Sequence, residues 1–162
     1  MRSRSTEPII AQLSNTQGRV KCPAVFAWAA CTVCASHLIV SIRVLVVDDD
    51  PSIRLLVARV VARAGYAVTE AVDGRAAITA LQAERFDAVV LDLMMPHVNG
   101  LEVLAFVNKH CPARPCVIIT SAADARLLAA ADAPAVAAKL RKPFDIAELL
   151  AALHSCITQG AP

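Results

Sequence analysis

The sequence predicts an α/β fold in which a doubly wound, five-stranded parallel sheet carries helices on both faces. From residue 41 onward, short apolar runs rich in β-branched residues alternate with longer segments in which apolar residues recur at helical spacing. This strand–helix alternation occurs five times, which is typical of a parallel sheet with both faces covered. The composition is 57% hydrophobic but only 4% aromatic, and such an aliphatic core suits helices that lie on a sheet.

The first expected unit is a strand at about 42–47 and the helix that follows it. Pro51 and Ser52 open this helix, Gly65 ends it, and Asp50 is expected to serve mainly as its cap. Its apolar positions recur three and four residues apart, as in a helix with one buried face: Ile53, Leu56, Val57, Val60 and Val61.

Four further units complete the pattern. The expected strands lie at 66–71, 86–91, 116–119 and 136–140, and the expected helices at 74–84, 100–110, 124–132 and 145–157. Pro112 and Pro115 interrupt the chain between the third helix and the fourth strand. In the last helix, apolar residues at helical spacing are expected to form the core face: Leu149, Leu150, Leu153 and Ile157.

The expected strand order brings several polar residues together. Right-handed crossovers leave few possible topologies, and we expect the flavodoxin-like order 2-1-3-4-5. In this order the crevice at the carboxyl ends of the strands lies between the first and third strands. Asp48 and Asp49 follow the first strand, and Asp92 follows the third. Thr120 and Lys142 follow the fourth and fifth strands and face the same crevice.

These residue types predict a metal site beside an anion site. Carboxylates held close together repel one another unless a cation lies among them, and oxygen ligands of this kind suit Mg²⁺. We therefore expect Mg²⁺ at Asp48, Asp49 and Asp92. The Thr120 hydroxyl and the Lys142 ammonium then remain to hold an anion.

Charge argues against a nucleic-acid-binding surface. The 162 residues contain 16 Lys and Arg against 14 Asp and Glu, for a net charge of +2. Residues 1–40 hold four of the basic residues and one of the acidic ones, so the remainder carries −1. A body of this charge has no basic stripe that could follow a phosphate backbone, and direct nucleic-acid binding is not expected. The length fits one domain with an appendage.

Residues 1–40 are expected to be an extension of the domain. Residues 1–21 are polar without a usable period and are expected to be disordered. Residues 22–40 form an apolar stretch with three explanations: a membrane anchor, a signal peptide, or translation from a mis-called start. We favour the mis-called start, with Val40 as the true first residue, since the strand–helix pattern begins directly after it. Membrane association is therefore not expected.

Six cysteines are present, at positions 22, 31, 34, 111, 116 and 156. Cys116 lies in an expected buried strand and Cys156 on a helix, where a free thiol acts as a small hydrophobe. A disulfide framework is therefore not expected. The pair Cys31 and Cys34 has apolar surroundings and no second compact pair of ligands, so we do not expect a zinc site.

Four segments together resemble the receiver domain of two-component response regulators. They stand in order around the ends of successive strands: VLVVDDDPSIR at 44–54, VVLDLMMPHVNGLEVL at 89–104, VIITSA at 117–122 and LRKPFDIAELL at 140–150. The resemblance extends over about 41–158, so we expect a receiver domain at 41–159. It implies the same flavodoxin-like fold and a function in phosphorylation-dependent signalling.

The resemblance also implies roles for the converging residues. Asp92 would be the phosphorylated residue. Asp49 and Asp92 would bind Mg²⁺ directly, Asp48 largely through water, and the main-chain carbonyl of Met94 would complete the shell. The metal would offset the repulsion between the carboxylate and the incoming phosphoryl group.

On the same grounds, Lys142 would pair with Asp92 before the reaction and with a phosphoryl oxygen after it. Thr120 would then move toward the phosphoryl group and donate its hydroxyl, which displaces the segment after the fourth strand and acts as the switch. The bond between Lys142 and Pro143 would be cis, as is typical of this family.

Three positions depart from the family pattern. Lys139 stands three residues before Lys142, where the family usually has an aromatic residue that rotates inward when the threonine moves. Because an ammonium is costly to bury, we expect Lys139 to stay solvent-facing and the usual coupling to be altered. Met94 and Ala122 stand where family members often carry polar groups that place the hydrolytic water, so a long-lived phosphoryl-aspartate is expected.

The resemblance implies a cytoplasmic, single-domain response regulator. It would accept a phosphoryl group from a sensor histidine kinase or a histidine phosphotransfer protein and act by contact with a downstream protein. It would not be an enzyme, because it is consumed as the substrate. Two alternatives stay open. The first is a Mg²⁺-dependent phosphatase with an aspartate nucleophile, but such enzymes usually have a second aspartate two residues later, where this chain has Met94. The second is a non-phosphorylated interaction module, in which the acidic cluster would be vestigial.

Overall fold

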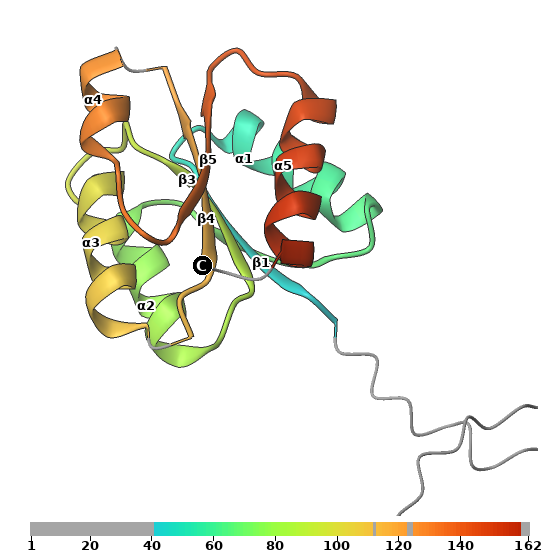
Figure 1. Ribbon diagram of the computed structural model, residues 1–162, viewed down its shortest axis with the longest axis horizontal. Coiled ribbons are helices and arrows are strands. Elements are labelled where there is room, and N and C mark those ends of the chain that lie inside the picture. The colour runs from blue at the N-terminus through green and yellow to red at the C-terminus, as the bar shows by residue number, and fades with distance from the viewer. Residues whose placement is uncertain (1–40, 112, 123–124, 160–162) are drawn as a thin grey trace, which may run out of the picture. The chain divides into compact units, whose positions relative to one another are not determined.

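The computed structural model describes residues 41–111, 113–122 and 125–159. The predictions made for residues 1–40 therefore lie outside the described residues. Strands and helices alternate along the described chain in the predicted order (Figure 1). Within this part of the chain, no helix has the length and apolar character needed to cross a membrane.

All ten predicted elements are present, and their ends differ from the predicted ones by no more than two residues. The strands are β1 (Arg43–Val47), β2 (Ala67–Ala71), β3 (Ala88–Asp92), β4 (Cys116–Ser121) and β5 (Val136–Arg141). The helices are α1 (Pro51–Arg63), α2 (Gly74–Ala83), α3 (Gly100–His110), α4 (Ala125–Ala130) and α5 (Ile146–Gln159).

The five strands form one parallel sheet in the order β2-β1-β3-β4-β5. This confirms the predicted flavodoxin-like topology. β4 continues two residues beyond its predicted end because both neighbouring strands pair with its last residues: Thr120 is opposite Asp92 of β3 and Leu140 of β5. Thr120 therefore lies within the strand instead of after it.

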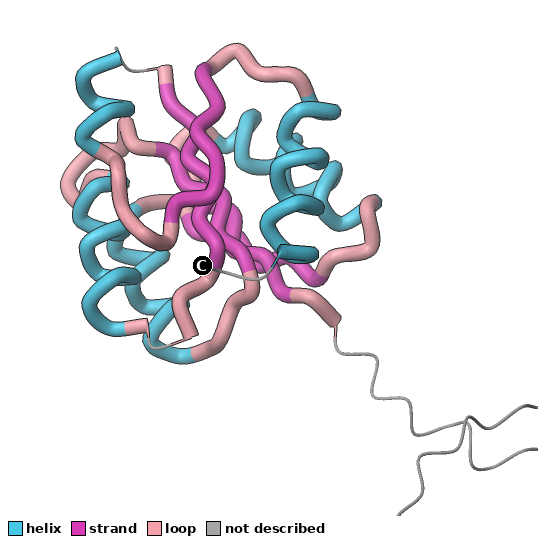
Figure 2. The backbone as a smooth tube through the Cα atoms, viewed as in Figure 1, coloured by secondary structure: helices cyan, strands magenta, loops and turns pink. Residues whose placement is uncertain are grey.

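Helices cover both faces of the sheet, with α2, α3 and α4 on one face and α1 and α5 on the other (Figures 1 and 2). Because successive side chains of a strand point to opposite faces, the buried residues separate into two clusters. Leu45 and Ile119 belong to the cluster under α2 and α3. Val46 and Ile118 belong to the cluster under α1 and α5. The strand ends are thus supported by apolar packing on both sides.

Local hydrogen bonds fix the helix starts near the polar strand ends. Asp50 caps α1 as predicted, since its carboxylate accepts from the N–H of Ser52 at 2.7 Å and of Ile53 at 3.3 Å. These bonds lower the pKa of Asp50. Asn99 and Glu102 form a capping box at the start of α3, in which each side chain accepts from the main-chain N–H of the other residue.

The predicted core face of α5 is present at Leu149, Leu153 and Ile157, and it contains an unexpected covalent bond. This face does not include Leu150, which is half-buried outside the core clusters. Leu149, Leu153 and Cys156 are buried against the sheet. The expectation of separate thiols was wrong for Cys116 and Cys156, which form a disulfide between β4 and α5. Their Cα atoms lie 6.1 Å apart, within the usual range for a disulfide. Cys111 is a free thiol.

Reduction of the Cys116–Cys156 bond is expected to lower the free energy of unfolding by roughly 2–4 kcal/mol, because the cross-link restricts the unfolded chain. Urea unfolding with and without reductant measures this difference. A double variant, Cys116→Ala with Cys156→Ala, should show no dependence on reductant. Alkylation of both thiols in unfolded, unreduced protein would contradict the bond. Since disulfides are rare in the cytosol, a bond found in protein taken from cells with its thiols blocked at once would contradict a cytoplasmic location.

Candidate functional site

Three carboxylates meet at the carboxyl ends of β1 and β3. Asp48 and Asp49 directly follow β1, and Asp92 is the last residue of β3. The two strands pair in parallel, so these ends are neighbours. One carboxylate oxygen from each residue lies within 4.8 Å of the others. Asp48 and Asp92 are only 3% and 4% exposed, whereas Asp49 is exposed, and the predicted convergence is therefore present with one side open to solvent.

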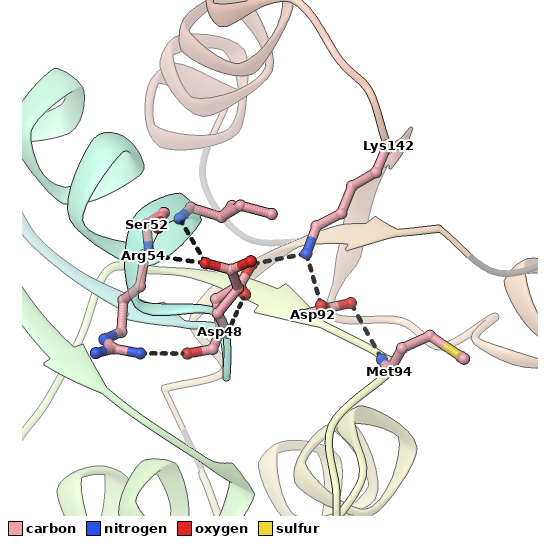
Figure 3. A network of polar contacts seen from close by, with 8 residues as sticks. Asp48, Ser52, Arg54, Asp92, Met94 and Lys142 are labelled. Atoms are coloured by element: carbon pink, nitrogen blue, oxygen red, sulfur yellow. Dashed lines mark hydrogen bonds and ion pairs between the residues drawn. The ribbon is translucent and has the colours of Figure 1, made fainter.

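Lys142 bridges two of these carboxylates. Its Nζ lies 2.7 Å from Oδ2 of Asp48 and 2.6 Å from Oδ2 of Asp92 (Figure 3). The Lys142 N–H donates to the carbonyl of Ser121 at 2.8 Å, which places the lysine beside the end of β4. The Lys142–Pro143 bond is cis, as the resemblance implied. The lysine side chain is 13% exposed, so its two ion pairs have little access to water.

Burial and the lysine together set the electrostatics of the site. Burial raises the pKa of Asp48, and this effect outweighs the contacts with Lys142, which act to lower it. Burial also acts to lower the pKa of Lys142, but its bonds to Asp48 and Asp92 outweigh that effect and raise the pKa. With one ammonium beside three carboxyl groups, the site keeps a surplus of negative charge that a cation would offset.

Main-chain N–H groups hold the second oxygen of each buried carboxylate. The Asp50 N–H donates to Oδ1 of Asp48 at 3.0 Å. The Met94 N–H donates to Oδ1 of Asp92 at 3.1 Å (Figure 3). Both carboxylates are therefore oriented by two donors each. The role of the Met94 carbonyl as a metal ligand stays a prediction; the side chain of this residue is 55% exposed.

The part played by Arg54 at the site was not predicted from the sequence. Nη1 of Arg54 donates to the main-chain oxygen of Asp48 at 2.9 Å, and its Nε pairs with Oε2 of Glu70 on β2 at 3.3 Å. The sequence does indicate that Arg54 lies on the buried side of α1, because it stands next to Ile53 and three residues before Val57. Helical periodicity alone does not identify a main-chain acceptor.

Thr120 and Gly100 lie beside Asp92. Thr120 is opposite Asp92 in the pairing of β3 with β4 and is 2% exposed, so it reaches the site as expected, while its switch role stays a prediction. At Gly100, an added Cβ would lie 2.3 Å from the main-chain oxygen of Asp92 and 2.7 Å from the Cα of Leu93. Glycine is required here because a side chain would displace the end of β3.

Of the residues that depart from the family pattern, Met94 takes part in this network through its main-chain N–H, whereas Lys139 and Ala122 lie outside it. Nζ of Lys139 pairs with Oδ1 of Asp132 at 3.2 Å, and the two side chains are 28% and 87% exposed. In this conformation Lys139 has a partner at the surface, in keeping with the expectation. Its behaviour on activation stays a prediction. Ala122 is exposed and adds no polar group to the site.

Comparison with known proteins identifies the family to which this geometry belongs. The family model described as response regulator receiver domain matches residues 44–154, from β1 into α5. The chain belongs to the response regulator receiver family. Signalling by phosphorylation is the general function of this family. Its receiver domains are generally non-enzymatic modules that bind Mg²⁺ at their aspartate cluster.

Individual proteins show the same relationship. The receiver domain is 38% identical to Response regulator MprA from Mycolicibacterium vanbaalenii over 75% of this chain and 52% of that protein. It is 36% identical to Transcriptional regulatory protein TcrA from Mycobacterium tuberculosis over 74% and 47%, respectively. The chain thus spans about half the length of these relatives. Among solved structures, response regulator TrrA from Thermotoga maritima, in complex with Mg(2+)-BeF, is 29% identical with a TM-score of 0.64, over 71% of this chain and 98% of that one.

Proposed function

We propose that the receiver domain is a phosphorylation switch whose acceptor is Asp92. Its phosphoryl donor is a sensor histidine kinase or a histidine phosphotransfer protein. The observation that carries the proposal is the ammonium of Lys142, which lies 2.7 Å from Asp48 and 2.6 Å from Asp92. An ion pair that only stabilised the fold would need one carboxylate, whereas this site gathers three, with Asp49 facing solvent.

Mg²⁺ fits the residues that are present. Three carboxylate oxygens within 4.8 Å of one another form a hard donor set on the open side of the site. We propose that Asp49 and Asp92 bind the ion directly, Asp48 largely through water, and the Met94 carbonyl completes the shell. The complex of TrrA with Mg(2+)-BeF supports this proposal. When bound, Mg²⁺ reduces the repulsion between the acceptor carboxylate and the phosphoryl oxygens.

Asp92 supplies the nucleophile. Before the reaction, Lys142 holds Oδ2 of Asp92 and the Met94 N–H holds Oδ1, which orients the carboxylate. One of these oxygens then forms a bond to the phosphorus atom of the donor. The bond between phosphorus and the donor's histidine nitrogen breaks, and its electron pair stays on that nitrogen. The Lys142 ammonium then pairs with a phosphoryl oxygen.

The output of the switch begins at Thr120. Its hydroxyl donates to the phosphoryl group and draws the end of β4 toward Asp92, since the added charge favours this loop arrangement. Lys139, held by Asp132 at the surface, stays solvent-facing in both states. The signal passes to a downstream protein through the segment that follows β4.

The net charge of residues 41–162 favours protein partners over nucleic acid. Residues 41–162 contain 12 Lys and Arg against 13 Asp and Glu, so this domain has no excess positive charge for a phosphate backbone. We propose a cytoplasmic location, where a kinase has access to its phosphate donor, and no direct contact with nucleic acid or membrane.

Incubation with acetyl phosphate and Mg²⁺ tests the proposed function. Intact-mass spectrometry should show the gain of one phosphoryl group, which is absent when a chelator removes the metal. A gain that does not depend on Mg²⁺ would contradict the proposal. Turnover of a small phosphate ester would favour the phosphatase alternative. A folded protein that reacts with neither acetyl phosphate nor a kinase would favour the non-phosphorylated interaction module.

The phosphoryl group on Asp92 is expected to persist for minutes or longer. Neither Met94 nor Ala122 has a polar side chain that could place a hydrolytic water. Mass spectrometry at successive times after removal of the donor measures the decay. Met94→Asn should shorten the lifetime, whereas Leu55→Asn, at an exposed apolar position on α1, should leave it unchanged. Loss of the group from the wild-type chain within seconds would refute this expectation.

A further inference from the structure

Arg54 joins three elements next to the proposed phosphorylation site. It belongs to α1, and its side chain is 14% exposed. Its Nη1 donates to the main-chain oxygen of Asp48 at 2.9 Å, just beyond β1. Its Nε pairs with Oε2 of Glu70 on β2 at 3.3 Å. Figure 3 shows the guanidinium approaching Asp48 on the side away from Lys142.

The oxygen that accepts from Arg54 belongs to the peptide group between Asp48 and Asp49. Because a peptide group is planar, a bond that fixes this carbonyl also fixes the direction in which the chain enters Asp49. The other main-chain bond of Asp48 holds its N–H, which donates to the carbonyl of Ala71 at 3.3 Å. The contact with Arg54 therefore helps to fix the backbone from which the two neighbouring carboxylates project.

We propose that Arg54, itself held by Glu70, is a positioning residue that presents the Asp48–Asp49 pair to Mg²⁺. This inference rests on the Mg²⁺ site of the proposed function. A guanidinium suits the task because its planar fork holds two acceptors in fixed directions, which an ammonium does not. When a residue that orients metal ligands through hydrogen bonds is replaced, the metal affinity typically falls by about 10- to 100-fold.

The direction in which Mg²⁺ affinity changes when Arg54 is replaced distinguishes a positioning role from a purely electrostatic one. Arg54 is a cation near an acidic site, so its charge alone opposes Mg²⁺ binding, and its removal would tighten binding. Positioning acts in the other direction: without the bond to the carbonyl, the carboxylates of Asp48 and Asp49 lose their common orientation and binding weakens. A role confined to stability would lower the melting temperature and leave the affinity unchanged.

Titration of the full chain with MgCl₂ by isothermal calorimetry tests the inference, at a temperature at which circular dichroism shows each variant folded. Arg54→Met is expected to weaken binding about tenfold, and Arg54→Lys to recover part of the loss. Glu70→Gln should weaken binding about threefold, since a partly exposed ion pair contributes little. The matched control is Arg59→Met, at an exposed arginine of the same helix, for which the Kd should not change.

Mg²⁺ binding by Arg54→Met that is as tight as in the wild type, or tighter, overturns the inference. If that variant does not fold, Arg54→Lys and Glu70→Gln decide, and a wild-type Kd in both overturns it. Absence of Mg²⁺ binding by the wild-type chain overturns the proposed function, and the inference with it.

Discussion

Asp92→Asn is expected to abolish phosphoryl incorporation from acetyl phosphate and from a kinase. The amide has nearly the shape of the carboxylate but lacks its negative charge and its nucleophilic oxygen. In the structure, Oδ2 of Asp92 lies 2.6 Å from Nζ of Lys142, and Oδ1 accepts from the Met94 N–H at 3.1 Å. An amide offers an acceptor to only one of these two donors. Intact-mass spectrometry after incubation with donor and Mg²⁺ measures the result.

The loss in Asp92→Asn should not come from unfolding. One carboxylate fewer reduces the repulsion at the site, and Lys142 keeps its bond to Asp48 at 2.7 Å, so urea unfolding should show stability equal to or above that of the wild type. Asp132→Asn, at a surface carboxylate that is 87% exposed, is the matched control and should incorporate fully. Phosphorylation of Asp49 in Asp92→Asn or in Asp132→Asn would mean that the acceptor is a residue other than Asp92.

Lys142→Met is expected to lower the free energy of unfolding by about 3 kcal/mol in the absence of divalent cations. Methionine has a similar length but no charge, so two buried carboxylates lose their shared partner, and uncompensated buried charge is strongly destabilising. Mg²⁺ should restore much of the loss, because it supplies positive charge at the same carboxylates. The loss should also shrink as the pH falls, since burial raises the pKa of Asp48 and protonation removes unpaired charge.

Urea unfolding in chelator and in MgCl₂ gives the measurement for Lys142→Met, and Lys139→Met is its control. Lys139 also forms an ion pair, but its partner Asp132 is 87% exposed, and surface pairs contribute about 0–1 kcal/mol. The control should therefore lose little stability and show no additional dependence on Mg²⁺. Equal, small and Mg²⁺-independent losses in both variants would mean that Lys142 does not pair with buried carboxylates in solution.

The fold was predictable because it follows from local patterns and from rules of connection. Five strand–helix units, together with right-handed crossovers, left the observed strand order as the expected one. The same reasoning brought Asp48 and Asp92 together, since residues at the carboxyl ends of adjacent parallel strands meet. Thr120 was placed beside Asp92, as the pairing shows, but outside its strand, because pairing with two neighbours at once extends β4 beyond its most apolar residues.

Features that depend on tertiary contacts were missed. The Cys116–Cys156 bond joins residues 40 positions apart, and helical spacing indicates the buried face of α5 but not which strand residue that face contacts. Arg54 donates to a main-chain oxygen, which every residue possesses, so its sequence position did not reveal the acceptor. The pairing of Lys142 with Asp92 was implied by resemblance, but its second bond, to Asp48, required the geometry.

The distance along the chain between Lys142 and Asp48 has a consequence for biosynthesis. Ninety-four positions separate the two residues that form this bond, and β3 and β4 lie between their strands in the sheet. A nascent chain that already displays Asp92 still lacks the ammonium that orients it, because that group arrives with the final strand. The proposed acceptor is therefore expected to be oriented only when the last strand has docked, and a chain truncated before Lys142 is expected to accept phosphoryl groups poorly.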